Sequence, residues 1–135
     1  MSSPPPAGST STEIQTVIAW HEALNSGDVE RLVEISHTDV EVGGPRGTAQ
    51  GAQVLREWVD RANINLEPGR ILHEDDTVVV EQEAEWVSAE PGSRQAVASV
   101  FLVHDGLVTS VVRYPGLAEA LRASGLEKPQ EIGPE

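Results

Sequence analysis

The stretch TVVVEQEAEWVS, residues 77–88, decides the fold, because apolar and polar residues alternate along it with a period of two. Successive side chains of a strand point to opposite faces of the sheet. One face then carries Val78, Val80, Gln82, Ala84 and Trp86. The other face carries three carboxylates, Glu81, Glu83 and Glu85. The pattern is typical of a half-buried antiparallel strand with a solvated outer face.

Downstream of this strand the sequence predicts a meander. The segment EPGS at 90–93 turns the chain, and residues 95–103 return as a strand. Asp105-Gly106 is the strongest hairpin signal in the chain, and residues 107–114 form the strand that follows it. A short helix over 117–123 ends at Gly125. Strands of this kind, joined by tight turns, pair antiparallel.

Upstream, the apolar spacing changes to that of helices. Residues 13–25 predict a first helix ended by Ser26-Gly27, and Asp28 caps a short second helix. A short strand over 40–42 breaks at Gly43-Gly44-Pro45, and a third helix covers 51–62. Helices and strands occupy separate runs, so the fold class is α+β, with three N-terminal helices and a short C-terminal helix.

The chain has the length of one domain. Its 135 residues hold one core. Residues 1–11 are rich in Pro, Ser and Thr and offer nothing to bury, and residues 127–135 have the same character. We therefore predict a domain over 12–126 between two disordered tails.

Composition excludes several classes of function. A formal net charge of -13, with 22 acids against 9 bases, opposes binding to nucleic acid or an anionic membrane. The sequence has no cysteine, so it has neither a disulfide nor a thiolate nucleophile. The four histidines have no HxxxH or HExxH spacing, so we expect no metal and no cofactor. The first 12 residues lack the pattern of a signal peptide, and we expect a cytoplasmic protein.

Three short motifs carry a family resemblance. They are ALNSGD at 23–28, Gly47 and Gly51 before the third helix, and DGLV at 105–108. In their order and spacing the chain resembles the nuclear transport factor 2-like superfamily, particularly its SnoaL-like branch. The resemblance implies a cone-shaped, strongly curved antiparallel sheet, an apolar pocket inside the cone and a homodimer formed through the sheet. The superfamily includes ketosteroid isomerases, polyketide cyclases, limonene epoxide hydrolase and members that only bind or assemble, so it does not fix the chemistry.

The catalytic patterns of these relatives are incomplete here. When the chain is aligned to the ketosteroid isomerase pattern, three residues take the positions of the catalytic ones. Trp20 replaces the oxyanion-binding Tyr, Gly44 replaces the base, and Val100 replaces the protonated acid. Epoxide hydrolases and several cyclases carry an acid directly after an Arg on the last strand, where this chain has Arg113 followed by Tyr114. A guanidinium stays protonated and cannot activate water, but it can hold an oxyanion or a carbonyl oxygen.

The candidate ligand-binding residues each have a structural alternative. Alternation places Thr109, Val111 and Arg113 on one face, and the resemblance turns that face inward; Arg113 is either a ligand anchor or a charge at the end of a strand. Gln82 interrupts an apolar face, so its amide is hydrogen-bonded either to a ligand or to Arg113 and a water. Arg46 is an anion contact or a surface charge. The remaining candidates are Val100 and the three tryptophans, which either fill the core or recognise a ligand: Trp20, Trp58 and Trp86.

Two functions follow from these residues. The first is a small-molecule pocket protein that binds a mostly apolar or partly oxygenated ligand, as a cyclase, isomerase or hydrolase, with Arg113 at the oxygenated end. The second is a non-catalytic homodimer or partner-binding module, with tryptophans filling the cone. The glutamates of the outer face are either solvated or contact arginines of a second subunit. A pocket of several hundred cubic ångströms would count against the second function.

Overall fold

A computed structural model describes residues 12–44, 47–62, 64–86, 94–126 and 130–132 of the chain; of residues 62, 86 and 130–132 it describes the backbone alone. Four helices and seven strands cover these ranges. The helices are α1 (Thr12–Ser26), α2 (Val29–Glu34), α3 (Ala52–Ala62) and α4 (Leu117–Ser124). The strands are β1 (Ser36–Gly44), β2 (Gly47–Gln50), β3 (Ile64–Glu74), β4 (Thr77–Trp86), β5 (Arg94–His104), β6 (Leu107–Tyr114) and β7 (Gln130–Ile132).

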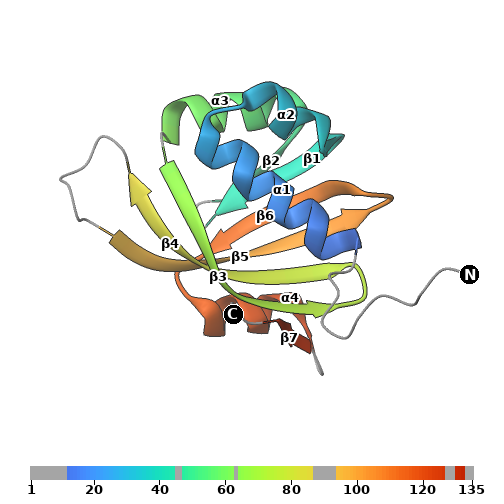
Figure 1. Ribbon diagram of the computed structural model, residues 1–135, viewed down its shortest axis with the longest axis vertical. Coiled ribbons are helices and arrows are strands. Elements are labelled where there is room, and N and C mark those ends of the chain that lie inside the picture. Colours follow the sequence, from blue (N-terminus) through green and yellow to red (C-terminus); the bar gives the residue numbers. More distant parts are fainter. Residues whose placement is uncertain (1–11, 45–46, 63, 87–93, 127–129, 133–135) are drawn as a thin grey trace, which may run out of the picture.

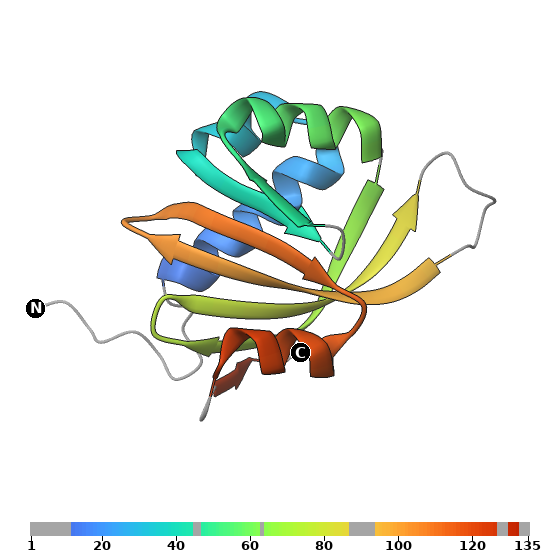
Figure 2. The same cartoon turned by 180° about the vertical axis from the view of Figure 1, so that it is seen from behind.

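The strands form one curved sheet in the order β2-β1-β6-β5-β4-β3-β7 (Figure 1). Helices α1, α2 and α3 lie over one face, and α4 lies against the opposite face (Figures 1 and 2). The predicted α+β class, the curved sheet and the four helices are confirmed. The sheet is mixed, because β1 runs parallel to β6 while the neighbours in the meander pair antiparallel.

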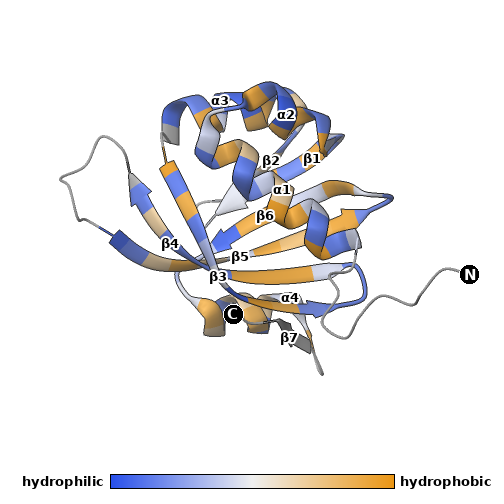
Figure 3. Ribbon diagram, in the orientation of Figure 1, coloured by the Kyte–Doolittle hydropathy of each residue, from blue (hydrophilic) through white to orange (hydrophobic). Residues whose placement is uncertain are grey.

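The sheet has a buried cluster on each face. Apolar and polar residues alternate along β3 and β4 (Figure 3). The inner face, under α1 and α3, holds the larger core, which includes Trp20, Leu55 and Phe101. A smaller cluster on the outer face lies under α4 and includes Val79 and Ala98. Each face is therefore closed by helices from a different end of the chain.

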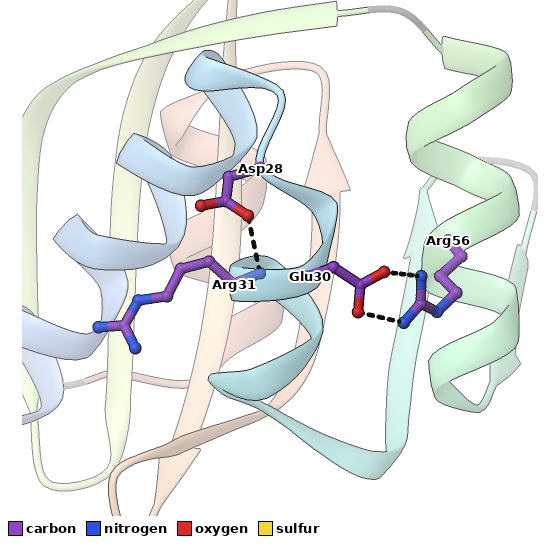
Figure 4. Close-up of polar contacts among 4 residues, drawn as sticks. All are labelled: Asp28, Glu30, Arg31 and Arg56. Atoms are coloured by element: carbon purple, nitrogen blue, oxygen red, sulfur yellow. Dashed lines mark hydrogen bonds and ion pairs between the residues drawn. The ribbon is translucent and has the colours of Figure 1, made fainter.

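Polar contacts fix the helices to one another and to the sheet. Asn25, at the end of α1, donates to the Leu66 carbonyl oxygen and accepts from the Leu66 N–H, both at 2.9 Å, which ties α1 to β3. Asp28 caps α2 as expected, because its carboxylate accepts from the Arg31 N–H at 3.1 Å (Figure 4). Glu30 on α2 forms a bidentate ion pair with Arg56 on α3, at 2.9 and 3.0 Å (Figure 4).

The described turn between β5 and β6 follows the sequence prediction more closely than the sheet edges do, while the predicted turn at 90–93 lies outside the described residues. Asp105 and Gly106 both have positive φ, 53° and 77°, as the β5–β6 hairpin requires. Two edge strands lie outside the prediction. Strand β2 pairs with β1, and β7 pairs with β3 inside the region 127–135 that the sequence marks as a tail. An edge strand pairs through its backbone N–H and C=O groups. It can therefore form without the alternating apolar pattern by which a strand is predicted from sequence. Within the described residues, no helix combines the length and the apolar character needed to cross a membrane.

Candidate functional site

An open cleft of about 740 Å³ lies between the β1–β2 hairpin, α3 and the end of β6. Glycines and small side chains form the hairpin wall, Trp58 and Arg61 come from α3, and Arg113 comes from β6. The described lining residues are Val42, Gly43, Gly44, Gly47, Thr48, Ala49, Val54, Trp58, Arg61 and Arg113. The volume is within the usual range of ligand sites, and the wall combines an apolar surface with two guanidinium groups.

Gly43 allows the hairpin wall to close. A Cβ atom at this position would overlap the Thr48 side chain and would lie 2.7 Å from the Gly47 carbonyl oxygen. The second contact is with backbone, which cannot rotate away. A residue without a Cβ is therefore required where β1 and β2 come together beside the cleft.

We expect Gly43→Ala to lower the free energy of unfolding by about 1–3 kcal/mol, because the overlap forces β1 and β2 apart. Gly44→Ala is the matched control, since its Cβ would meet its nearest described neighbour, the Arg113 carbonyl oxygen, at an ordinary 3.9 Å. Urea unfolding of the two variants measures the difference. Equal stability would show that the hairpin tolerates a side chain at Gly43.

A small cavity of about 10 Å³ lies beside the cleft and shares four of its lining residues, Val42, Gly43, Trp58 and Arg113. Its other walls come from α1, β3, β5 and β6: Trp20, Leu66, Ser99 and Val111. The volume is close to that of one water molecule. The site therefore has an open outer part and a narrow inner part, with Arg113 and Trp58 lining both.

Arg113 faces the inside of the sheet, as the alternation together with the family resemblance predicts. It pairs with Ser99 across the β5–β6 ladder, and its neighbour on the same face is Val111, which belongs to the inner core. The residue is half-buried, and burial lowers the pKa of its guanidinium from the ordinary value. A guanidinium remains protonated at neutral pH even so, and it presents hydrogen-bond donors only. Arg113 can hold an oxyanion or a carbonyl oxygen in the cleft.

Two of the three predicted tryptophans line the site. The Trp20 ring is fully buried, stacks on Trp58 with ring centroids 6.3 Å apart, and meets Phe101 edge-to-face at 5.1 Å. Trp58 is partly exposed and lines the cleft. Among the described residues, the Nε1 of Trp20 is the buried side-chain polar atom that has no hydrogen-bond partner. Trp20 therefore fills the core, lines the inner cavity, and carries a buried donor without a described partner.

Gln82 belongs to a buried chain of hydrogen bonds. The sequence predicts a bond to a ligand, or to Arg113 and a water; the partners in the structure are instead His21 and Ser99. The Gln82 Nε2 lies 2.8 Å from the His21 Nε2, and the Ser99 hydroxyl donates to the Gln82 Oε1 at 2.8 Å. The His21 Nδ1 lies 2.8 Å from the Val17 carbonyl oxygen. Gln82 is 1% exposed, and its amide oxygen and nitrogen both have side-chain partners in the chain.

Burial keeps His21 neutral. The residue is 2% exposed, and the loss of solvent lowers the pKa of its imidazole from 6.5 to about 4, against the opposing effect of the hydrogen bond to Val17. A neutral imidazole donates from one ring nitrogen and accepts at the other. At neutral pH, His21 therefore serves as a fixed link in the chain and carries no charge.

Three predicted site residues differ from expectation or lie outside the described part. Val100 does not reach the pocket: it packs on the outer face with Tyr114 and Leu117 against the cluster under α4. Its neighbours in β5, Ser99 and Phe101, face inward, so alternation turns Val100 outward. Arg46 lies outside the described residues. Trp86 ends β4, and its side chain is likewise outside the described part.

The structure adds residues that the sequence analysis did not single out. Ser99 lines the inner cavity and His21 anchors the chain behind it. Ser99 had a readable signal, since it interrupts the inward face of β5 between Val97 and Phe101 as Gln82 does on β4. His21 had a weaker signal, because helical spacing alone does not place a histidine beside a strand 61 residues away.

The described lining of the cleft and the inner cavity contains neither a carboxylate nor an imidazole. Among the described residues, no group of three or more His, Asp or Glu side chains is arranged to hold a metal ion. The titratable groups of this lining are the guanidinium groups Arg61 and Arg113. What the described site offers chemically is therefore apolar contact, the guanidinium donors of Arg61 and Arg113, and the hydroxyl groups of Thr48 and Ser99.

Known structures share this architecture. A candidate polyketide cyclase from Sinorhizobium meliloti has a TM-score of 0.67 and 19% identity, covering 77% of this chain and 99% of its own. A second candidate polyketide cyclase, from Xanthomonas campestris pv. campestris, has a TM-score of 0.65 and 21% identity, covering 80% and 93%. TerC, co-crystallised with polyporic acid, has a TM-score of 0.69 and 20% identity, covering 83% and 99%. At these identities the likeness establishes the fold.

The sequence itself matches a family model. No curated protein matches this chain. The model of the SnoaL-like domain matches residues 17–111, a range that runs from α1 to β6 and includes Trp20, Gln82 and Ser99. Because this model covers more than half of the chain, the chain belongs to the SnoaL-like domain family.

Proposed function

We propose that this chain binds a mostly apolar small molecule that has one oxygenated end. The apolar body lies in the cleft against Trp58 and Val54, and Arg113 holds the oxygenated end. The observation that carries the proposal is the position of Arg113, a half-buried cation that lines both the cleft and the inner cavity, beside apolar side chains such as Trp58 and Val111. A charge placed there, partly out of water, interacts more strongly with an anionic oxygen than a surface arginine does.

A cyclase-like role is the reaction class that the structural neighbours favour. In such a role, Arg113 would stabilise an enolate or carbonyl oxygen as negative charge develops on it. The described lining supplies no group to move a proton, so the proposal rests on binding and electrostatic stabilisation. The alternative, a cone filled with aromatic side chains, describes the interior around Trp20 well, but the cleft at the mouth leaves room for a ligand.

The binding site is tested with 2-naphthoate and naphthalene, which share an apolar body and differ in the carboxylate. We expect Arg113→Ala to weaken 2-naphthoate by about tenfold or more and to leave naphthalene nearly unchanged, because only the carboxylate loses a charged partner. Titration of tryptophan fluorescence measures both affinities. Arg122→Ala on α4 is the matched control and is expected to bind both probes like the wild type.

Two results would contradict this site. If neither probe binds the wild type, the cleft is not a pocket for molecules of this kind. If 2-naphthoate binds Arg113→Ala and the wild type equally, the guanidinium does not hold the oxygenated end, and the residue is a structural charge at the end of β6.

We extend the proposal to a homodimer formed through the outer face of the sheet. Support comes from the family resemblance, which implies pairing through the sheet; Leu102, on the outward side of β5 and 40% exposed, would lie in this contact. Arg94 on the same sheet forms ion pairs with Glu83 and Glu85 of its own chain, at 2.8 and 3.8 Å, and partly neutralises the acidic face. Light scattering of the purified protein measures the oligomeric state.

The acidic, cysteine-free composition supports a cytoplasmic location.

A further inference from the structure

The buried chain behind the inner cavity has a fixed direction. It begins at the Val17 carbonyl oxygen, which can only accept a hydrogen bond, so the His21 Nδ1 must donate. The neutral imidazole then accepts at Nε2, and the Gln82 amide nitrogen, 2.8 Å away, donates to it. This orients the Gln82 Oε1 toward Ser99, whose hydroxyl donates its proton at 2.8 Å. Each step follows from the one before it.

This direction determines the polarity of Ser99 in the cavity. A serine hydroxyl has one proton and two lone pairs. Because the Ser99 hydroxyl donates its proton to Gln82, the hydroxyl oxygen of this cavity-lining residue can act toward a further partner only as an acceptor. A backbone carbonyl on α1 thus fixes the hydrogen-bonding character of a side chain on β5.

Trp20 supplies the opposite polarity to the same cavity. Its ring lines the cavity, its side chain is fully buried, and its Nε1 has no partner among the described residues. An indole N–H can only donate. A buried donor without a partner is unfavourable, and a ligand oxygen or a water would relieve it. With about 10 Å³, the cavity holds one oxygen atom and little more.

We propose that the inner cavity is a hydroxyl-recognition site, in which the ligand hydroxyl donates to Ser99 and accepts from the Trp20 Nε1. The inference rests on the proposed binding function and adds a hydroxyl contact beside Arg113, which lines the same cavity. Of the common oxygen groups, a hydroxyl supplies a donor and an acceptor on one atom, whereas an ether or a ketone oxygen leaves Ser99 facing another lone pair. The specificity-determining residue is Ser99, and His21 and Gln82 are positioning residues. The ligand class is a phenol or an alcohol on an apolar skeleton.

Three probes with one skeleton test the site: 2-naphthol, 2-methoxynaphthalene and naphthalene. We expect the wild type to bind 2-naphthol about tenfold more tightly than the methyl ether, because only the hydroxyl can donate to Ser99. In Gln82→Leu the Ser99 proton is free to turn toward the cavity and donate, so this preference should fall to about twofold or less. A purely structural effect of the substitution would weaken all three probes alike and keep the ratio.

Ser99→Ala gives a second measurement in case Gln82→Leu does not fold, and it should also abolish the preference, because the acceptor itself is gone. Far-UV circular dichroism checks the fold of each variant. If the wild type binds the three probes with equal affinity, the hydroxyl site is wrong while the binding function stands. If it binds none of them but binds 2-naphthoate, only the hydroxyl site is overturned; if 2-naphthoate does not bind either, the binding function falls as well. A preference for 2-naphthol that persists in both folded variants would also overturn the assignment.

Discussion

Trp20→Ala is expected to lower the free energy of unfolding by about 3–5 kcal/mol, among the largest effects available in this chain. The Trp20 ring is fully buried and contacts aromatic rings on three sides, from His21, Trp58 and Phe101. Alanine removes these contacts and leaves a void between α1 and the sheet, which rigid neighbours can fill only in part. Denaturant unfolding followed by circular dichroism measures the change.

Trp20→Phe separates the ring from the N–H group. Phenylalanine keeps an aromatic ring in the same place, and the donor that it removes has no partner among the described residues. The loss of stability is therefore expected to be less than half of that in Trp20→Ala. Trp58→Ala is a second comparison, because Trp58 is partly exposed at the cleft and leaves a smaller void. Equal losses in all three variants would show that Trp20 is not the centre of the inner core.

The local parts of the fold could be predicted from the sequence because their signals are local. Alternation over 77–88 sets the strand and its inward face, and Asp105-Gly106 sets the last hairpin. Pairing between distant segments leaves no such signal. The parallel contact of β1 with β6 and the edge pairing of β7 with β3 depend on how the sheet curves, which the sequence pattern of either strand does not encode.

The site shows the same division between local and distant information. Arg113 could be placed because the family resemblance, together with alternation along β6, turns its face inward. The same alignment placed Val100 at a site position, but alternation in β5 turns Val100 outward, where α4 covers the sheet. Thr109 is expected inward with Arg113, but the ladder is irregular here, since Val103 pairs with Val108 and Leu102 with Ser110. Thr109 falls in this bulge, where its hydroxyl donates to the Leu102 carbonyl oxygen at 3.1 Å.

Acidification is expected to destabilise the protein through His21. The pKa of this imidazole is about 4 in the folded state and 6.5 as its ordinary value, so the unfolded chain binds a proton more readily. Above pH 6.5 both states are neutral at His21 and the full stability is present. As the pH falls from 6.5 toward 4, the unfolded state takes up the proton first and is stabilised, and the total loss amounts to about 3 kcal/mol.

Urea unfolding at about pH 7 and about pH 5 measures this dependence, in a range above the titration of ordinary carboxylates. At neutral pH, His21→Phe is expected to have a lower free energy of unfolding than the wild type, because Gln82 loses a partner. Between about pH 7 and about pH 5, the free energy of unfolding of this variant is expected to change little. His104→Gln, which replaces a side chain that is 72% exposed, is expected to keep the acid dependence of the wild type. If His21→Phe keeps that dependence too, the proton is taken up elsewhere. The neutral form of His21, which gives the hydrogen-bond chain to Ser99 its direction, would then lose its main support.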